Sequence, residues 1–167
     1  ENANVRLGNV DGSSTTTFLN NEAFGHGGAH VSVDNDFTTY GNVNYLYNTA
    51  AAGNGGAFTV TGGSHVTMNA GKQTFTGNKA TGKGGAIYSD VNVTINAVNK
   101  YITFSGNTAN GESNAIYMNN PDSVLTINAN GKTVNLNDKI SGAEGYKFNI
   151  NGSSGNNINV GNSIEKS

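Results

Sequence analysis

Short stretches in which apolar and polar residues alternate recur along the chain and predict β-strands. The clearest stretch covers residues 91–97, where Val or Ile at positions 91, 93 and 95 alternates with Asn or Thr. A period of two residues is the signature of a strand with one buried face. Gly, Asn and Asp fill the gaps between such stretches, and no stretch carries the 3.6-residue apolar stripe of a helix. The pattern predicts an all-β protein with short strands and tight turns.

Three motifs recur in the same order with a period of about 29 residues. The first motif is an aromatic residue followed three positions later by Asn: Phe18–Asn21, Tyr45–Asn48, Phe75–Asn78 and Phe104–Asn107. The second is a triplet of small residues: Gly27-Gly28-Ala29, Gly55-Gly56-Ala57, Gly84-Gly85-Ala86 and the divergent Ser113-Asn114-Ala115. The third is a closing strand with alternating residues: 66–70, 93–97 and 125–129.

Three short strands per repeat predict a right-handed parallel β-helix, a solenoid with one repeat per coil and roughly five coils. Residues 1–16 end a preceding coil, and residues 17–167 hold about five repeats. In the faint fifth repeat we assign Val134–Asn137 to the first motif and Gly145–Phe148 to the second. The pattern begins and ends within a repeat, so we expect a single β-helix segment of a longer array. Exposed strand edges at its ends predict end-to-end association.

Stacking of successive coils predicts the interior. Paired strands lie about 4.8 Å apart, so equivalent residues of successive coils lie directly over one another. The aromatic residues of the first motif then form an interior stack, and its asparagines form a ladder of amides at a corner. The predicted core consists of Phe75, Phe104, Ile87, Ile116, Val93, Ile95, Leu125 and Ile127.

Composition narrows the classes of function. Asn (30), Gly (24), Thr (17) and Ser (13) make up half of the 167 residues, as a fold rich in tight turns requires. Charged residues are only 12% of the chain, the net charge is −2 and there is no basic run, so we expect no nucleic-acid partner. No apolar run approaches the roughly 20 residues that span a bilayer, so we expect no membrane insertion by this segment. The chain has no Cys, so stacking rather than disulfides is expected to stabilise it.

The paired motif resembles the repeat of the chlamydial polymorphic outer membrane proteins and related autotransporter passengers. Its closest copy is Phe75-Thr76-Gly77-Asn78 with Gly84-Gly85-Ala86-Ile87, and the resemblance covers roughly residues 17–118. It implies a β-helical passenger at the bacterial cell surface or secreted, which adheres to a host-cell receptor or glycan or to neighbouring bacterial cells. Tyr45 in place of Phe, and the fourth triplet without glycine, depart from the pattern.

Candidate chemistry in the sequence is sparse. Gly25-His26-Gly27 matches a tripeptide of β-helical polygalacturonases, and Asp34 and Asp36 could share a strand face, but nothing links these carboxylates to His26. His30 and His65 have no partners at the spacing of metal ligands. We therefore expect no enzyme, cofactor or metal. A β-helical module that binds or degrades polysaccharide remains the alternative function, and a structural spacer without a ligand is the third.

The outward positions of the closing strands are the candidate binding face: Thr67, Asn69, Thr94, Asn96, Thr126 and Asn128. Stacked hydroxyls and amides could contact a glycan or, as in ice-binding solenoids, a water lattice. The alternative interpretation is structural, because Thr favours exposed strand positions and Asn favours strand ends.

Overall fold

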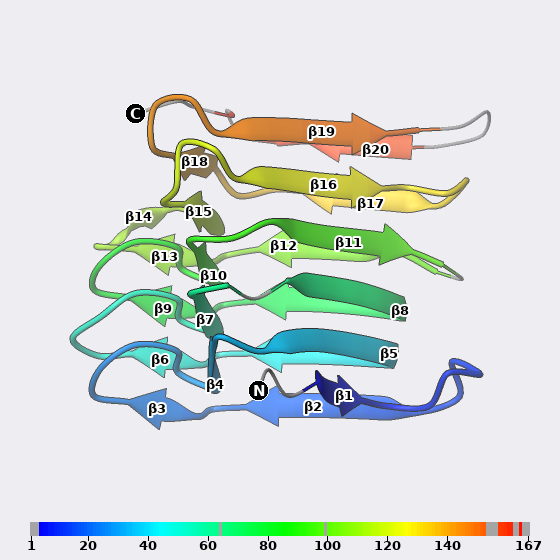
Figure 1. Cartoon of the computed structure of the whole chain (residues 1–167), viewed down its shortest axis with the longest axis horizontal. Helices are drawn as coiled ribbons and strands as arrows, with labels where there is room; N and C mark the ends of the chain where they lie inside the picture. Colours follow the sequence, from blue (N-terminus) through cyan, green and yellow to red (C-terminus); the bar gives the residue numbers. More distant parts are fainter. Residues whose placement is uncertain (1–3, 64, 99, 153–156, 162–163, 165–167) are drawn as a thin grey trace.

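The chain folds into a β-solenoid of about four turns, with successive turns about 29 residues apart. The computed structural model describes residues 4–63, 65–98, 100–152, 157–161 and 164, and every regular element in these ranges is a β-strand. The chain runs along the near strands, returns along the far ones and climbs in the right-handed sense (Figure 1). The predicted all-β solenoid and its period are confirmed, with a number of turns nearer four than five.

Each turn has three main strands, which we call the closing, aromatic and middle strands. The closing and aromatic strands of all turns together form one ten-stranded sheet. The closing strands are β1 (Asn4–Leu7), the first halves of β5 (Asp36–Leu46) and β8 (Val66–Thr76), β11 (Val93–Ala97), β16 (Val124–Asn128) and β19 (Lys147–Asn151). The aromatic strands are β2 (Thr15–Leu19), the second halves of β5 and β8, β12 (Ile102–Ser105), β17 (Thr133–Leu136) and β20 (Asn157–Val160). The two families belong to one sheet because β5 and β8 continue through the corner between them.

Gly41 is the corner residue of β5. Its φ is +76°, and the register with β8 shifts between Gly41 and Val43. A Cβ atom at position 41 would lie 2.5 Å from the carbonyl oxygen of Ser14 in the preceding turn. Only glycine therefore allows the strand to bend here while the turns stay in contact.

Two smaller sheets complete each turn. The middle strands are β4 (His30–Val33), β7 (Phe58–Thr61), β10 (Ile87–Ser89), β15 (Ile116–Met118) and β18 (Ile140–Gly142), stacked in one column (Figure 1). The corner strands are β3 (Glu22–Ala23), β6 (Thr49–Ala50), β9 (Lys79–Ala80), β13 (Thr108–Ala109) and β14 (Glu112–Ser113). Pairing between turns is parallel, whereas β14 folds back antiparallel onto β13.

The Gly-Gly-Ala triplets lie where the backbones of successive turns approach closely. A Cβ atom on Gly85 would lie 2.5 Å from the carbonyl oxygen of Asn114 and 2.5 Å from the nitrogen of Thr108, both in the next turn. In the fourth turn the β13–β14 hairpin changes the path of the chain, and Asn114 Nδ2 donates to Ser141 Oγ at 2.6 Å. This different path accounts for a triplet without glycine.

The fifth repeat differs from the prediction. The prediction that Gly145–Phe148 holds the second motif is wrong, because β18 already forms the middle strand before it and Lys147–Asn151 is the closing strand. Leu136, and not Val134, pairs with Phe104. The repeat is shorter than the others, since only 23 residues separate Asn128 from its neighbour Asn151. The spacing of motifs in the earlier repeats therefore does not apply to this shorter repeat, and it predicts the wrong segment.

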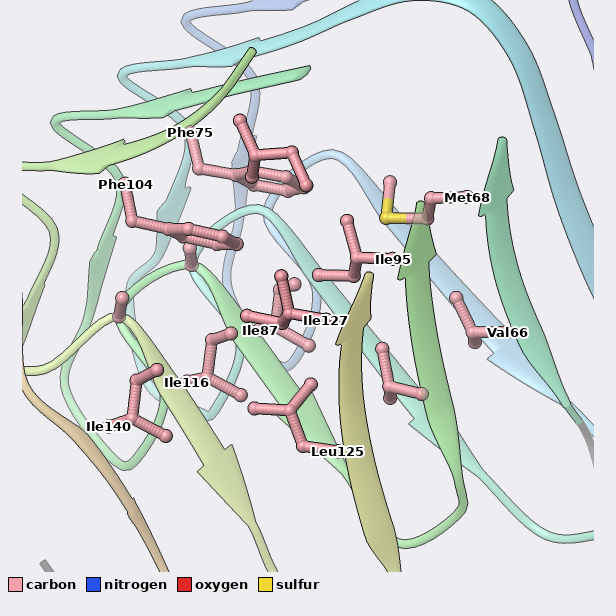
Figure 2. Packing of buried hydrophobic residues seen from close by; sticks show 14 of the residues in the cluster. Val66, Met68, Phe75, Ile87, Ile95, Phe104, Ile116, Leu125, Ile127 and Ile140 are labelled. Atoms are coloured by element: carbon pink, nitrogen blue, oxygen red, sulfur yellow. The ribbon is translucent and has the colours of Figure 1, made fainter. Parts of the chain in front are cut away.

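Apolar side chains fill the inside of the solenoid. The aromatic stack has ring centroids 4.7 Å apart for Phe18 and Tyr45, 5.1 Å for Tyr45 and Phe75 and 4.5 Å for Phe75 and Phe104, with planes within 8° of parallel. Phe75 and Phe104 lie one above the other beside columns of isoleucine (Figure 2). All eight predicted core residues are fully buried, which confirms the predicted interior.

An amide ladder runs along the corner that follows the aromatic stack. Asn48, Asn78 and Asn107 are 0% exposed. The Oδ1 atom of Asn78 accepts from the backbone nitrogen of Asn48 at 3.0 Å and from its Nδ2 at 2.9 Å. Asn78 Nδ2 in turn donates to Asn107 Oδ1 and to the carbonyl oxygen of Tyr45, both at 2.9 Å. A buried amide is stable here because every donor and acceptor has a partner.

The ladder ends on a carboxylate. Asp138 Oδ2 accepts from Asn107 Nδ2 at 2.6 Å and from its backbone nitrogen at 3.0 Å, while Oδ1 accepts from the nitrogen of Gly106 at 2.8 Å. We expected Asn137 in this place. The Asp138 carboxylate accepts all three of these hydrogen bonds, so the ladder ends at this residue.

The buried ladder should contribute more to stability than a similar ladder on the surface. Asn78→Ala removes the acceptor of the Asn48 backbone nitrogen and of one Nδ2 hydrogen of Asn48, and the side-chain donor to the Tyr45 carbonyl, so the free energy of unfolding should fall by about 3 kcal/mol. Asn96→Ala, in a half-exposed amide row, is the matched control and should cost less than about 1 kcal/mol, because water can replace its partners. Urea denaturation followed by circular dichroism measures both, and equal losses would contradict this prediction.

Tyr45 is a second site for a stability test. Its hydroxyl is buried without a hydrogen-bond partner, and burial raises the pKa of the phenol. Tyr45→Phe restores the residue found in the other aromatic positions of the repeat and should raise the free energy of unfolding by about 1 kcal/mol. Tyr47→Phe, where the side chain is exposed, should change it little. A loss of stability in Tyr45→Phe would show that the hydroxyl makes a favourable contact.

Candidate binding face on the closing strands

The register of the closing strands brings the six candidate residues together in two adjacent rows. Thr67, Thr94 and Thr126 are cross-strand partners in successive turns, and so are the asparagines two positions further on. All six side chains are half-buried and alternate with the fully buried core residues of the same strands. We name this outward surface, with residues Thr67, Asn69, Thr94, Asn96, Thr126 and Asn128, the closing face.

The closing face extends beyond the six residues at both ends. In the first turn Thr38 and Tyr40 pair with Thr67 and Asn69, and in the last turn Asn149 and Asn151 continue the two rows. Sequence reasoning missed these positions. Alternation at 148–151 was a usable signal, but the first turn has polar Thr39 at an inward position, which obscures the pattern.

The asparagine row is a continuous hydrogen-bonded chain. Asn96 Nδ2 donates to Asn69 Oδ1 at 2.6 Å, Asn128 Nδ2 to Asn96 Oδ1 at 2.6 Å, and Asn151 Nδ2 to Asn128 Oδ1 at 2.7 Å. Every amide therefore points the same way. Each Nδ2 also has a second hydrogen and each Oδ1 a second lone pair, so the row still offers donors and acceptors at the spacing of the strands.

The threonine row has unused hydroxyl groups. Among the described residues, none makes a hydrogen bond with the hydroxyl of Thr67, Thr94 or Thr126. A hydroxyl can donate one hydrogen bond and accept others. The six residues of the closing face are all threonine or asparagine, so this surface is polar and carries no charge.

The candidate catalytic residues make local contacts between turns. Asp34 Oδ1 accepts from the nitrogen of Gly63 at 2.9 Å, and Asp36 Oδ1 from the nitrogen of His65 at 3.1 Å. The carboxylate of Asp36 also lies 3.5 Å from His65 Nδ1. His26 Nδ1 accepts from the nitrogen of Asn54 at 3.0 Å. Each of these side chains thus bonds the backbone of the next turn.

His30 belongs to the core. Its position in the stack is that of Phe58, Ile87, Ile116 and Ile140 in the following turns. The imidazole lies 4.4 Å from the ring of Phe37 and 5.3 Å from that of Phe58, between centroids, and neither ring nitrogen has a partner. Burial lowers the pKa of His30 to about 4.

Two further observations bear on ligands and membranes. Within the ranges that the structure describes, no three His, Asp or Glu side chains gather closely enough to hold a metal ion. The same ranges contain no helix of membrane-spanning length and hydrophobicity.

These features define a parallel β-solenoid built from a repeated strand-and-turn unit, with one regular polar face. Residues 74–90 match the family model of the Chlamydia polymorphic membrane protein repeat. The matched segment contains Phe75–Asn78 and Gly84–Ile87, so the resemblance seen in the sequence is confirmed there. A β-solenoid with this repeat fits the passenger of an autotransporter-like protein. No curated protein and no solved structure matches the chain significantly.

The buried His30 predicts a loss of stability in mild acid. The unfolded chain takes up this proton near pH 6.5, whereas the folded chain resists it down to about pH 4. Stability is therefore full above pH 6.5 and falls as the pH drops from 6.5 towards 4, by up to about 3 kcal/mol. His30→Phe, which follows the pattern of Phe58, should remove this part of the pH dependence. Urea denaturation at pH 7.5 and pH 4.5 measures it, and the same slope in both proteins would rule out His30 as the cause.

Proposed function

We propose that this chain is a non-catalytic segment of a surface-displayed passenger that mediates adhesion. Its expected location is the outside of the bacterial outer membrane, or the medium after secretion. The partner is a host-cell receptor or glycan, or the surface of a neighbouring bacterium. The closing face is the proposed contact surface.

The observation that carries this proposal is that a row of threonine hydroxyls without partners lies beside a row of asparagines whose amides all donate in the same direction. The threonine hydroxyls have no partner among the described residues, and the asparagines are held by bonds of 2.6–2.7 Å. Such a surface is ordered before it binds, so little side-chain freedom is lost on contact. The match to a membrane-protein repeat supports display at the surface.

The contacts of the acidic residues support a protein without catalysis. A glycoside hydrolase needs one carboxyl group as acid and another as base or nucleophile on either side of a bond. Asp34 and Asp36 instead accept hydrogen bonds from the backbone of the next turn. Loss of a polysaccharide-cleaving activity in Asp34→Asn or Asp36→Asn would overturn this part of the proposal.

Adhesion through the closing face predicts a specific loss of cell binding. A triple variant with Thr67, Thr94 and Thr126 changed to Lys replaces three hydroxyls by long charged chains in one row. Saturable binding of the labelled chain to epithelial cells or bacteria should weaken at least about tenfold, because the partner loses these hydrogen bonds and meets three like charges.

The matched control places three lysines on the aromatic strands. Asn44, Thr74 and Thr103 also form one outward row of cross-strand partners. This variant should bind like the original chain, with both variants β-rich by circular dichroism. Equal binding by all three proteins would remove the closing face as the contact surface, and no binding by the original chain would favour a structural spacer.

A further inference from the structure

The outer surface of the middle strands is irregular, unlike the closing face. One outward row of cross-strand partners contains Val31, Thr59, Tyr88 and Tyr117 in successive turns. The rings of Tyr88 and Tyr117 are stacked with centroids 6.0 Å apart and planes 5° from parallel. Thr59, directly before them, is much smaller than its two successors. The row therefore has a step at which the stack of rings stops.

The step coincides with a hollow of about 310 Å³. Its wall includes Tyr88, Thr59, Val31, His26, Asn54 and Asp90. One face of the Tyr88 ring is covered by Tyr117, and the other face is on the side of Thr59, whose own side chain is only 3% exposed. The size lies at the lower end of the roughly 300–1,000 Å³ that is typical of small-molecule sites. We name this hollow the Thr59 notch.

Neighbouring side chains hold the ring that forms the wall of the notch. The Asp90 carboxylate interacts with the Tyr88 side chain, and Asp90 Oδ1 accepts from Asn119 Nδ2 at 2.8 Å. Burial and the nearby carboxylate raise the pKa of Tyr88 to about 12, so the phenol stays neutral. On the far side of the pair, Lys83 Nζ donates to the Tyr117 hydroxyl at 2.8 Å and lies 4.2 Å from the centre of that ring. The aromatic wall is therefore held in place before any ligand arrives.

Polar groups line the side of the notch. His26 Nδ1 accepts from the nitrogen of Asn54, so Nε2 is free to face solvent as the second ring nitrogen. Asn54 Oδ1 accepts from the nitrogen of Lys83 at 2.8 Å, and Asn54 Nδ2 has no acceptor among the described residues. Asp90 also lines the notch and adds a carboxylate as an acceptor. Donors and acceptors thus surround a half-buried tyrosine and a half-exposed valine.

We propose that the Thr59 notch binds one uncharged pyranose unit of an oligosaccharide, stacked on the face of Tyr88. A pyranose has a face of C–H groups that suits an aromatic ring and a rim of hydroxyls that suits an amide, an imidazole and a carboxylate. An apolar peptide side chain would leave these polar groups unpaired. The Asp90 carboxylate would repel the carboxylate of an acidic sugar. The nearby Lys83 does not offset this repulsion, because it is hydrogen-bonded to Tyr117. The site goes beyond the proposed adhesion function, since it lies on a different sheet from the closing face.

Solution NMR of the ¹⁵N-labelled chain tests the notch. The probes are tetrasaccharides of glucose, N-acetylglucosamine, galactose and mannose, with tetragalacturonate as the charged comparison. At least one uncharged probe should shift the amide signals of Thr59, Tyr88 and Asp90 in a saturable way, and the uronate should bind more weakly. The absence of saturable shifts with all four uncharged probes would overturn the proposal, as would shifts confined to the closing face.

Matched variants separate stacking from a general loss of structure. Tyr88→Ala should weaken binding by about tenfold or more, whereas Tyr88→Phe keeps the ring face and should stay within about threefold. Thr59→Tyr extends the outward row into the notch and should abolish binding. Thr59 is 3% exposed and its hydroxyl donates to the carbonyl oxygen of Asn54 at 2.9 Å, so circular dichroism and the NMR spectrum check that this variant keeps the fold. Tyr101→Ala removes an exposed tyrosine elsewhere and should have no effect. Undiminished binding in Thr59→Tyr would overturn the proposal.

The test is independent of the adhesion proposal. None of these variants alters the closing face, and the triple lysine variant leaves the notch intact. Cell binding that survives Thr59→Tyr together with lost oligosaccharide binding supports both proposals. Oligosaccharide binding that survives the triple lysine variant keeps the notch even if the closing face contributes nothing.

Discussion

The structure depends on hydrogen bonding between turns that keeps equivalent residues in register. Once the backbone of one turn pairs with the next, each side chain lies over its equivalent about 4.8 Å away, and it must be compatible with a copy of itself. Phe75 meets this condition by stacking on Phe104, and Asn78 meets it by donating to Asn107. An amide is suited to such a ladder because it carries both donor and acceptor. The sequence repeats because each side chain must pack or bond with its equivalent in the next turn.

The two amide ladders show how the surroundings set direction. In the buried ladder each Nδ2 donates towards the C-terminal turn, as Asn78 does to Asn107. In the ladder of the closing face each Nδ2 donates towards the N-terminal turn, as Asn96 does to Asn69. The buried direction is dictated by the backbone, because the nitrogen of Asn78 also donates to Asn107 Oδ1 and its second Nδ2 hydrogen must reach Tyr45. The surface ladder has no such bonds to the backbone, and nothing in the contacts of Asn96 explains its direction.

Positions that face their own copies could be predicted from the sequence, and positions that do not could not. The core, the aromatic stack, the ladder and the two rows of the closing face follow from motif order and the strand period. The fifth repeat was misassigned because it is shorter than the others and its ladder residue is Asp138, which belongs to no motif. The burial of His30 was missed because a histidine in an isoleucine position leaves no pattern. The Thr59 notch was missed for a related reason, since it arises from a difference in size between turns that have the same register.

This division between repeated and unrepeated positions also bears on function. The interior must repeat, so differences between turns accumulate on outward positions and in the loops. On the closing face the outward residues repeat from turn to turn as well. This face therefore offers a partner a long row of similar polar groups. The middle strands do not, and Thr59 beside Tyr88 makes a single site of defined shape. A long regular surface favours many shallow contacts with an extended partner, whereas a notch selects one chemical group. Under the two proposals made above, the closing face would hold a cell surface and the Thr59 notch would recognise a sugar.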